Sequence, residues 1–171
     1  MQGLIASRLD RVLTYSAAAA VASATVAALL AASLRGPADY QPGDKFAAVS
    51  GFDPTRSSAT IVMFMDSSCS HCRESAPVLS RIAQAPRTFQ VIVIGYEDLD
   101  SLRQFVQTSA IVADAVITVP EGAIRFSAFP KLAVLDRRGV VRFAWSGSRQ
   151  ITGSEANIRA AAHTLGGPEI P

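Results

Sequence analysis

The chain has 171 residues, of which 49% are hydrophobic, and its 16 basic and 14 acidic residues give a formal net charge of +2. Such a length fits one globular domain of ordinary size with a short appendage. A charge this close to zero gives no electrostatic reason for a nucleic-acid partner, and none is expected.

Residues 1–35 are predicted to direct the chain to a membrane. Residues 12–34 contain no charged side chain, and these 23 residues are enough to cross a bilayer as a helix. Arg8 and Arg11 precede them, which places that end in the cytoplasm. The segment fits a single-pass signal anchor or a secretory signal cleaved near residues 31–33, and the third interpretation is a buried Ala-rich helix.

Either of the two export interpretations carries the remaining chain into an oxidising compartment, where disulfide chemistry is stable. Residues 36–45 contain proline, glycine and polar side chains with little periodicity, which predicts a tether. The folded domain is expected to span residues 46–171.

The domain begins with a strand and a helix. Residues 59–65 form a short apolar run, typical of a central strand buried on both faces. Residues 66–68 are helix N-cap candidates, and a helix is predicted from Cys69 to about Ala83. Pro77 falls inside this helix and is expected to kink it.

Further strands and helices follow in a regular order. They are a buried strand at 89–95, an amphipathic helix at 99–108, a brief strand or an extended loop at 115–119, a hairpin of 131–135 and 140–145 with its turn at 136–139, and a last helix from about 153 to 165. The strand–helix–strand order requires a parallel pair, and the hairpin adds antiparallel strands. We therefore expect an α/β fold with a mixed central sheet and helices on both faces.

Cys69 and Cys72 are the two cysteines of the chain. A disulfide between them would close too small a loop to stabilise the fold much, so a reactive role is expected. At a helix N-terminus Cys69 faces unpaired backbone N–H groups and the positive end of the helix dipole. Both favour the thiolate, which is the attacking form. Cys72, one turn later and more buried, can attack back to resolve a mixed disulfide.

Ser70 and His71 lie between the cysteines and are the positions expected to tune their reactivity. A protonated His71 would place a positive charge beside the Cys69 thiolate. This charge would stabilise the reduced form and make the disulfide more oxidising.

Three features together resemble the thioredoxin fold. They are the CxxC of Cys69 and Cys72 between the first strand and its helix, Pro77 five residues later, and Phe129–Pro130 directly before the hairpin. The stretch 123–130 and the N-terminal segment resemble the membrane-anchored TlpA/ResA-like branch of this superfamily.

The resemblance implies a thiol–disulfide oxidoreductase of the bacterial inner membrane with its domain in the periplasm. Its partners would be cysteine-containing protein substrates and a membrane thiol–disulfide donor or acceptor. It would need no cofactor or metal beyond the redox-active Cys69–Cys72 disulfide. Pro130 would be cis and would pack against that disulfide, and the backbone of Phe129 would pair with an extended substrate segment.

The direction of electron flow stays open. Cys-x-His-Cys resembles disulfide isomerase and the DsbA-like oxidases, whereas TlpA/ResA-like reductants usually have proline where His71 stands. Four positions also depart from the patterns of these families. Ser68, Met63 and Ser75 replace an aromatic residue, a buried Asp and an acid respectively, and Phe129 stands where Thr or Val is common. Asp66 and Glu74 are the remaining candidates for accepting the Cys72 proton.

Three other functions match parts of the sequence. A structural zinc site needs four ligands, and the chain offers only Cys69, Cys72, His71 and His163. His71 lies between the cysteines and cannot readily bind the same metal ion with them. A Sco-like copper chaperone would space its cysteines by three residues and add a histidine before the hairpin, which this chain lacks. A non-catalytic interaction module would explain the missing aromatic residue and acid, but not the retention of both cysteines.

Overall fold

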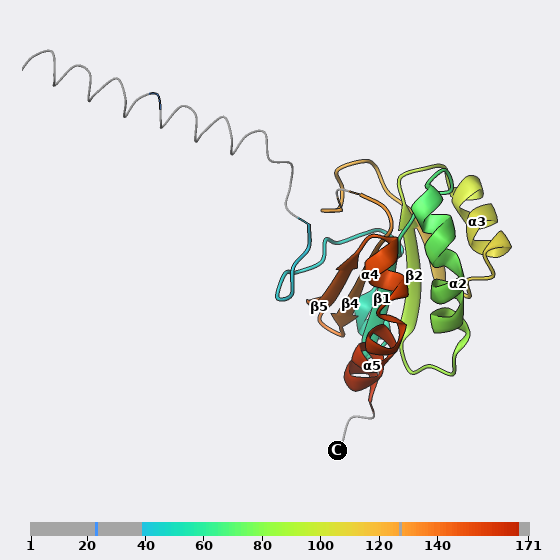
Figure 1. The fold of residues 1–171 in the computed structure, drawn as a ribbon. Coiled ribbons are helices and arrows are strands. Elements are labelled where there is room, and N and C mark those ends of the chain that lie inside the picture. Colours follow the sequence, from blue (N-terminus) through green and yellow to red (C-terminus); the bar gives the residue numbers. More distant parts are fainter. Residues whose placement is uncertain (1–22, 24–38, 127, 168–171) are drawn as a thin grey trace, which may run out of the picture. The chain divides into compact units, whose positions relative to one another are not determined.

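The computed structural model describes Ser23, residues 39–126 and residues 128–167. The chain divides into two compact units, Met1–Pro37 and Ala38–Pro171, and the sheet with its helices belongs to the second (Figure 1). The predicted membrane-directing segment lies outside the described residues apart from Ser23. Among the residues that the structure describes, no helix is long and apolar enough to cross a membrane.

The described residues form one five-stranded sheet in the order β3-β2-β1-β4-β5. The strands are β1 (Ala59–Phe64), β2 (Gln90–Gly95), β3 (Ala115–Thr118), β4 (Lys131–Asp136) and β5 (Val141–Ser146). β1 pairs in parallel with β2 and antiparallel with β4, so the predicted mixed sheet is confirmed. Every residue of β1 and β4 is buried, as expected for strands covered on both faces.

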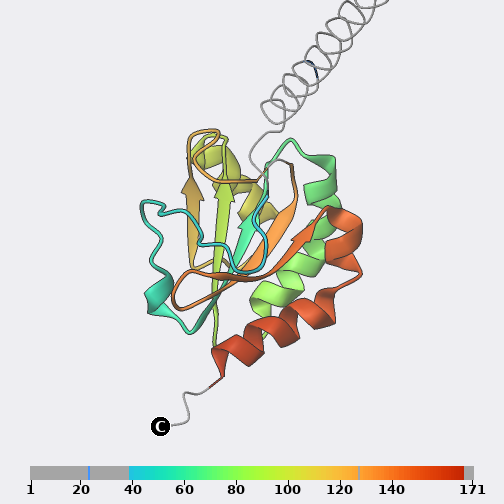
Figure 2. The same ribbon diagram turned by 90° about the vertical axis from the view of Figure 1, so that its left-hand side faces the viewer.

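The helices lie on one face of the sheet, so the expectation of helices on both faces was wrong. They are α2 (Ser70–Gln84), α3 (Leu99–Thr108), α4 (Ser148–Thr152) and α5 (Glu155–Gly166). Figures 1 and 2 show α2 and α3 on the same side of the sheet. Buried side chains of all four helices share one core cluster with Ile61 and Met63 of β1. The physical reason is the path from β1 through β2 to β3, which advances across the sheet in one direction. Right-handed crossovers then place α2 and α3 on the same side.

The opposite face is covered by irregular chain and aromatic rings instead of helices. Tyr40 stacks on Phe46 with 4.8 Å between ring centroids, and Phe126 packs on Phe64 of β1 at 4.7 Å. The Tyr40 hydroxyl also accepts a hydrogen bond from the Ala47 N–H (3.0 Å). Tyr40, inside the predicted tether of residues 36–45, is therefore buried on this face, while residues 41–43 are exposed.

Helix α4 was not predicted at all. It has five residues, and glycines stand on both sides of it at Gly147 and Gly153. One turn of helix is too short to show a hydrophobic period, and only Ile151 within it is buried. The helix packs against α2, which carries the cysteines.

Asp136, at the turn of the β4–β5 hairpin, is expected to contribute measurably to the stability of the fold. This buried carboxylate accepts hydrogen bonds from the N–H groups of Arg138 (2.9 Å) and Val140 (3.0 Å) and from the Arg142 guanidinium (2.6 Å). Burial acts to raise the pKa of Asp136, but these hydrogen bonds outweigh it and hold the pKa below its usual 3.8. We expect Asp136→Asn to lower the free energy of unfolding by about 1–3 kcal/mol at pH 7 in urea titrations.

The sign of the pH dependence follows from the lowered pKa. The stabilisation by ionised Asp136 is complete above the unfolded-state value of about 3.8 and is lost as the pH falls through the lower folded value. The wild type should therefore lose its advantage over the Asn variant below about pH 4. Asp100→Asn, at an exposed carboxylate, is the control and should change stability by less than about 0.5 kcal/mol. An unchanged stability in the Asp136 variant at pH 7 would contradict this account.

Candidate active site

Cys69 is the N-cap of α2. Its backbone is extended (φ −76°, ψ 114°), and its sulfur accepts a hydrogen bond from the Cys72 N–H at 3.2 Å. The sequence pattern favours a cap among residues 66–68, but Asp66 caps the preceding turn instead, accepting a hydrogen bond from the Ser68 N–H at 2.8 Å. The Cys69 sulfur therefore lies at the positive end of the α2 dipole and accepts a backbone N–H.

Cys72 lies one helical turn further and is fully buried, whereas Cys69 is partly exposed. Burial, followed by the hydrogen bond to Cys69, raises the pKa of the Cys72 thiol above its usual value of 9.0. Asp66 also acts on this pKa, since its carboxylate charge raises it while its backbone contact lowers it. The motif thus contains one accessible sulfur that can attack and one buried thiol that stays protonated near neutral pH.

The His71 side chain is directed along α2 toward Glu74. Its Nδ1 lies 3.0 Å from a Glu74 carboxylate oxygen, and the same oxygen accepts a hydrogen bond from the Ser148 hydroxyl at 3.0 Å. These hydrogen bonds, that from His71 first, lower the pKa of Glu74. Of the two candidate proton acceptors, the charge of Asp66 contributes to the raised pKa of Cys72, while Glu74 is hydrogen-bonded to His71 and Ser148.

Phe129 and Pro130 lie at the same end of the sheet as the cysteines. The Phe129–Pro130 peptide bond is cis, as the resemblance implied. The next residue, Lys131, pairs with Phe64, where β1 ends and the loop to Cys69 begins. The Phe129 ring stacks on the Phe64 ring with 4.6 Å between centroids, and the Pro130 carbonyl accepts a hydrogen bond from the Gly147 N–H at 2.9 Å.

No protein-family model and no curated protein sequence matches the chain. Solved structures do match. A thiol:disulfide interchange protein of the thioredoxin family from Chlorobium tepidum TLS has a TM-score of 0.55 at 24% identity, covering 75% of this chain and all of the other. A thiol-disulfide isomerase from Corynebacterium glutamicum (TM-score 0.52, 19% identity) covers 77% of this chain and 94% of its own. MTB dsbF, solved in mixed oxidised and reduced forms (0.52, 17%), covers 63% and 80%.

The chain has a thioredoxin fold. At these identities the likeness establishes the fold, and the features that predicted it occupy the expected places. The CxxC stands between β1 and α2, Pro77 lies inside α2, and the cis-proline precedes β4. Pro77 is exposed and adds no polar group to the site.

Two serines of the thioredoxin-fold site have distinct positions. Ser75, which replaces the acid of the resembling branch, is fully buried and donates a hydrogen bond to the His71 carbonyl at 2.9 Å. Ser70 is the first residue of α2 and is exposed. Within the described parts of the chain, no group of three or more His, Cys, Asp or Glu residues lies close enough to hold a metal ion.

The unequal cysteines predict unequal alkylation. In the reduced, folded protein at pH 8, iodoacetamide should modify Cys69 alone, because Cys72 is buried and its raised pKa keeps it protonated. Peptide mapping by mass spectrometry should find the second label only after addition of denaturant. Labelling of both cysteines at equal rates in the folded protein would contradict the burial described here.

Proposed function

We propose that this chain is a thiol–disulfide oxidoreductase that exchanges disulfides with cysteine-containing proteins through Cys69 and Cys72. The observation that carries the proposal is the pairing of an accessible sulfur at a helix N-terminus with a buried, protonated thiol one turn away. The similar structures from Chlorobium tepidum TLS and Corynebacterium glutamicum are a thiol:disulfide interchange protein and a thiol-disulfide isomerase, which supports the same chemistry.

The reaction balances without a cofactor. The Cys69 thiolate attacks one sulfur of a substrate disulfide, forming a mixed disulfide and releasing the other substrate sulfur as a thiolate, which takes a proton. The Cys72 thiol then loses its proton and attacks the Cys69 sulfur, which forms the Cys69–Cys72 disulfide and releases the second substrate thiol. Two electrons pass from the protein to the substrate, and the reverse sequence oxidises a substrate dithiol.

The substrate is proposed to lie against Phe129 and Pro130. The Phe129 side chain is held by its stack on Phe64, so its backbone is fixed at the end of the sheet beside the cysteines. An extended segment can bind there through backbone hydrogen bonds that depend little on its sequence. This arrangement would bring a substrate cysteine to Cys69.

The proposed location is the periplasmic side of a bacterial inner membrane. It rests on the uncharged stretch 12–34, which is long enough to span a bilayer, and on cysteine chemistry suited to an oxidising compartment. In this proposal residues 1–35 anchor the chain, and a membrane thiol–disulfide protein exchanges electrons with the Cys69–Cys72 pair.

Insulin reduction tests the proposed activity. The full-length protein should accelerate the reduction of insulin disulfides by dithiothreitol, measured as the onset of turbidity, over dithiothreitol alone. The double variant Cys69→Ser/Cys72→Ser is the matched control and should give the uncatalysed rate. Equal rates with the wild type and the double variant would rule the proposal out.

His71 is expected to shift the redox potential of the cysteine pair. The proposed oxidising effect of its charge predicts a potential above about −270 mV, the value of thioredoxin. His71→Pro should lower the potential by about 30 mV, a tenfold change in the equilibrium constant. The bound Glu74 carboxylate offsets part of the His71 charge, which keeps the expected shift modest. Glutathione titrations measure it, with Gln107→Ala on α3 as the uncharged control, and an unchanged potential would show that His71 has no such role.

A further inference from the structure

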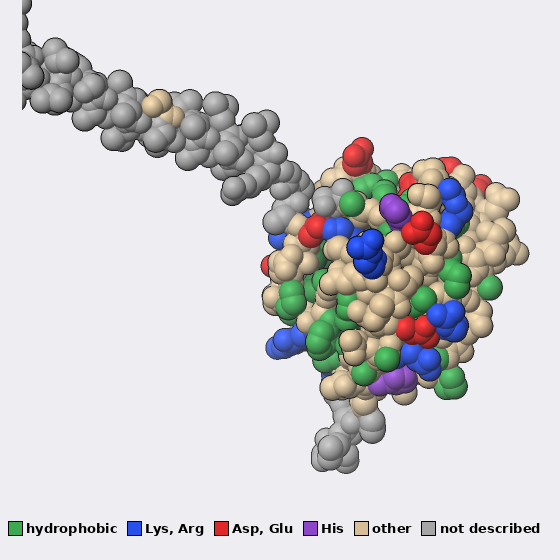
Figure 3. Space-filling model, viewed as in Figure 1, with side chains coloured by type: hydrophobic (Ala, Val, Ile, Leu, Met, Phe, Trp, Pro, Cys, Tyr) green, Lys and Arg blue, Asp and Glu red, His purple; other side chains and the backbone are tan. Residues whose placement is uncertain are grey.

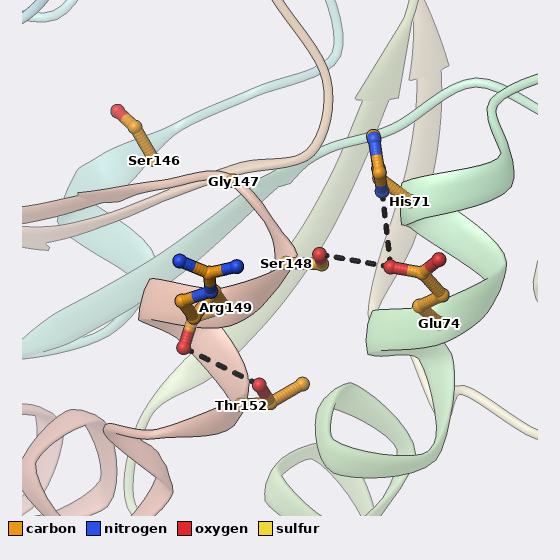
Figure 4. Close-up of a pocket in the computed structure, with 7 residues that line it drawn as sticks. All are labelled: His71, Glu74, Ser146, Gly147, Ser148, Arg149 and Thr152. Carbon is orange, nitrogen blue, oxygen red and sulfur yellow. Dashed lines mark hydrogen bonds and ion pairs between the residues drawn. The ribbon is translucent and has the colours of Figure 1, made fainter.

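A hollow of about 560 Å³ lies directly beside the CxxC (Figure 4). One wall is formed by His71 and Glu74 of α2, and the other by residues 146–149 and Thr152, where β5 passes into α4. The Gly147 N–H is bonded to the Pro130 carbonyl at 2.9 Å. The hollow therefore adjoins both places where a substrate is proposed to bind, the first turn of α2 and the cis-proline.

The two walls carry opposite charges, and only one of these charges is already partnered. The Glu74 carboxylate is held by His71 and Ser148, each at 3.0 Å. Arg149 is exposed, and its guanidinium makes no hydrogen bond or ion pair with any residue that the structure describes. Figure 4 shows Arg149 and Glu74 on opposite sides of the hollow, and Figure 3 shows basic, acidic and histidine side chains gathered over α2 and α4 on this face.

We propose that this hollow is a subsite for an acidic side chain of the substrate, close in sequence to the cysteine under attack, and that Arg149 selects it. The inference rests on the proposed exchange function and adds the substrate class. A guanidinium can bind a carboxylate with two parallel hydrogen bonds, and Arg149 is free to do so. The Glu74 charge on the other wall disfavours a carboxylate there and so directs the acidic group to the Arg149 side.

The position of Arg149 would make it a specificity residue without a part in the bond exchange. It stands on α4, whereas the sulfurs lie at the N-terminus of α2. Its loss should change the rate for acidic substrates and leave the rate for neutral ones unchanged. A merely structural role would instead change the rates for all substrates together.

Charge exchange between protein and peptide tests the subsite. The probes are short peptides with one cysteine, capped as a disulfide with mercaptoethanol, that carry Glu, Gln or Lys at one of the two positions on either side. The second-order rate of their reaction with the reduced full-length protein is measured at low ionic strength. At one position the wild type should prefer Glu over Gln by about two- to five-fold, the range for an exposed ion pair. Salt at about 0.5 M should reduce this preference.

Three variants distinguish the outcomes. Arg149→Gln should abolish the preference while keeping the rate for the Gln peptide, and Arg149→Glu should prefer Lys instead. Arg159→Gln, at a partly exposed arginine on α5, is the matched control and should retain the wild-type preference. Equal Glu and Gln rates at every position, or a preference that survives in Arg149→Gln, would overturn the subsite alone. If no peptide reacts with the wild type, the exchange function itself is wrong and the subsite with it.

Discussion

Cys69→Ser should lower the rate of reaction with a model disulfide by about a thousand-fold or more. A serine hydroxyl at the head of α2 is not ionised near neutral pH and cannot attack sulfur. Cys72 cannot replace the lost sulfur, because it is fully buried and its pKa is raised. Stopped-flow measurement with a chromogenic aromatic disulfide gives this rate directly.

The control for this variant is Gln107→Ala, which alters an exposed side chain of α3 outside the cysteine motif. Its rate should stay within about two-fold of the wild type, because the substitution removes no charge and no buried group. A Cys69→Ser protein that retained a tenth of the wild-type rate would show that another group attacks, and the assignment of Cys69 as the nucleophile would fail.

Cys72→Ser should turn the transient mixed disulfide into a stable product. Cys69 keeps its exposure and its place at the helix N-terminus, so it still attacks, but the sulfur that releases the substrate is gone. After mixing with a disulfide-bonded peptide, mass spectrometry should show nearly all of the variant joined to one peptide. The wild type under the same conditions should show the internal disulfide and free peptide.

Burial of a serine hydroxyl at this position could itself disturb the fold, since Cys72 is fully buried. Cys72→Ala leaves no polar group behind and should trap the same adduct, which separates the chemistry from any loss of stability. The double variant Cys69→Ser/Cys72→Ser should trap nothing. Release of peptide from either single variant at the wild-type rate would show that Cys72 does not resolve the intermediate.

The sheet and its longer helices could be predicted from the sequence because their signals are local. The apolar runs that became β1 and β4 are buried along their whole length, and the helical spacing over residues 99–108 matches α3 at both ends. The CxxC and the proline before the hairpin then made it possible to predict the fold, since each occupies a fixed place relative to those elements.

The covering of the sheet could not be predicted in the same way. The face occupied by each helix follows from the strand order, which requires knowing that β3 lies beyond β2 and not next to β4. The assignment of residues 36–45 as a tether relied on their composition. Tyr40 is nevertheless buried by rings that lie far from it in sequence, such as that of Phe126.

At the site, the cysteines and the cis-proline had sequence signals, but the surroundings of His71 had only one. His71 and Glu74 are three residues apart on a helix, a spacing at which side chains meet. Ser148 lies 74 residues beyond Glu74 on a single-turn helix, and no local sequence pattern predicts the hydrogen bond between them. Arg149 could not be predicted as a site residue for the same reason, because its position near the CxxC depends on the packing of α4 against α2.

The measurement that tests the central claim most directly is the redox equilibrium of Cys69 and Cys72 in the full-length protein. The protein is equilibrated in buffers spanning reduced to oxidised glutathione, the thiols are trapped with acid, and the oxidised fraction is counted by mass spectrometry. A reversible two-electron transition between dithiol and intramolecular disulfide is the predicted result. A pair that stays reduced in every buffer, or that forms only disulfides between chains, would contradict the account.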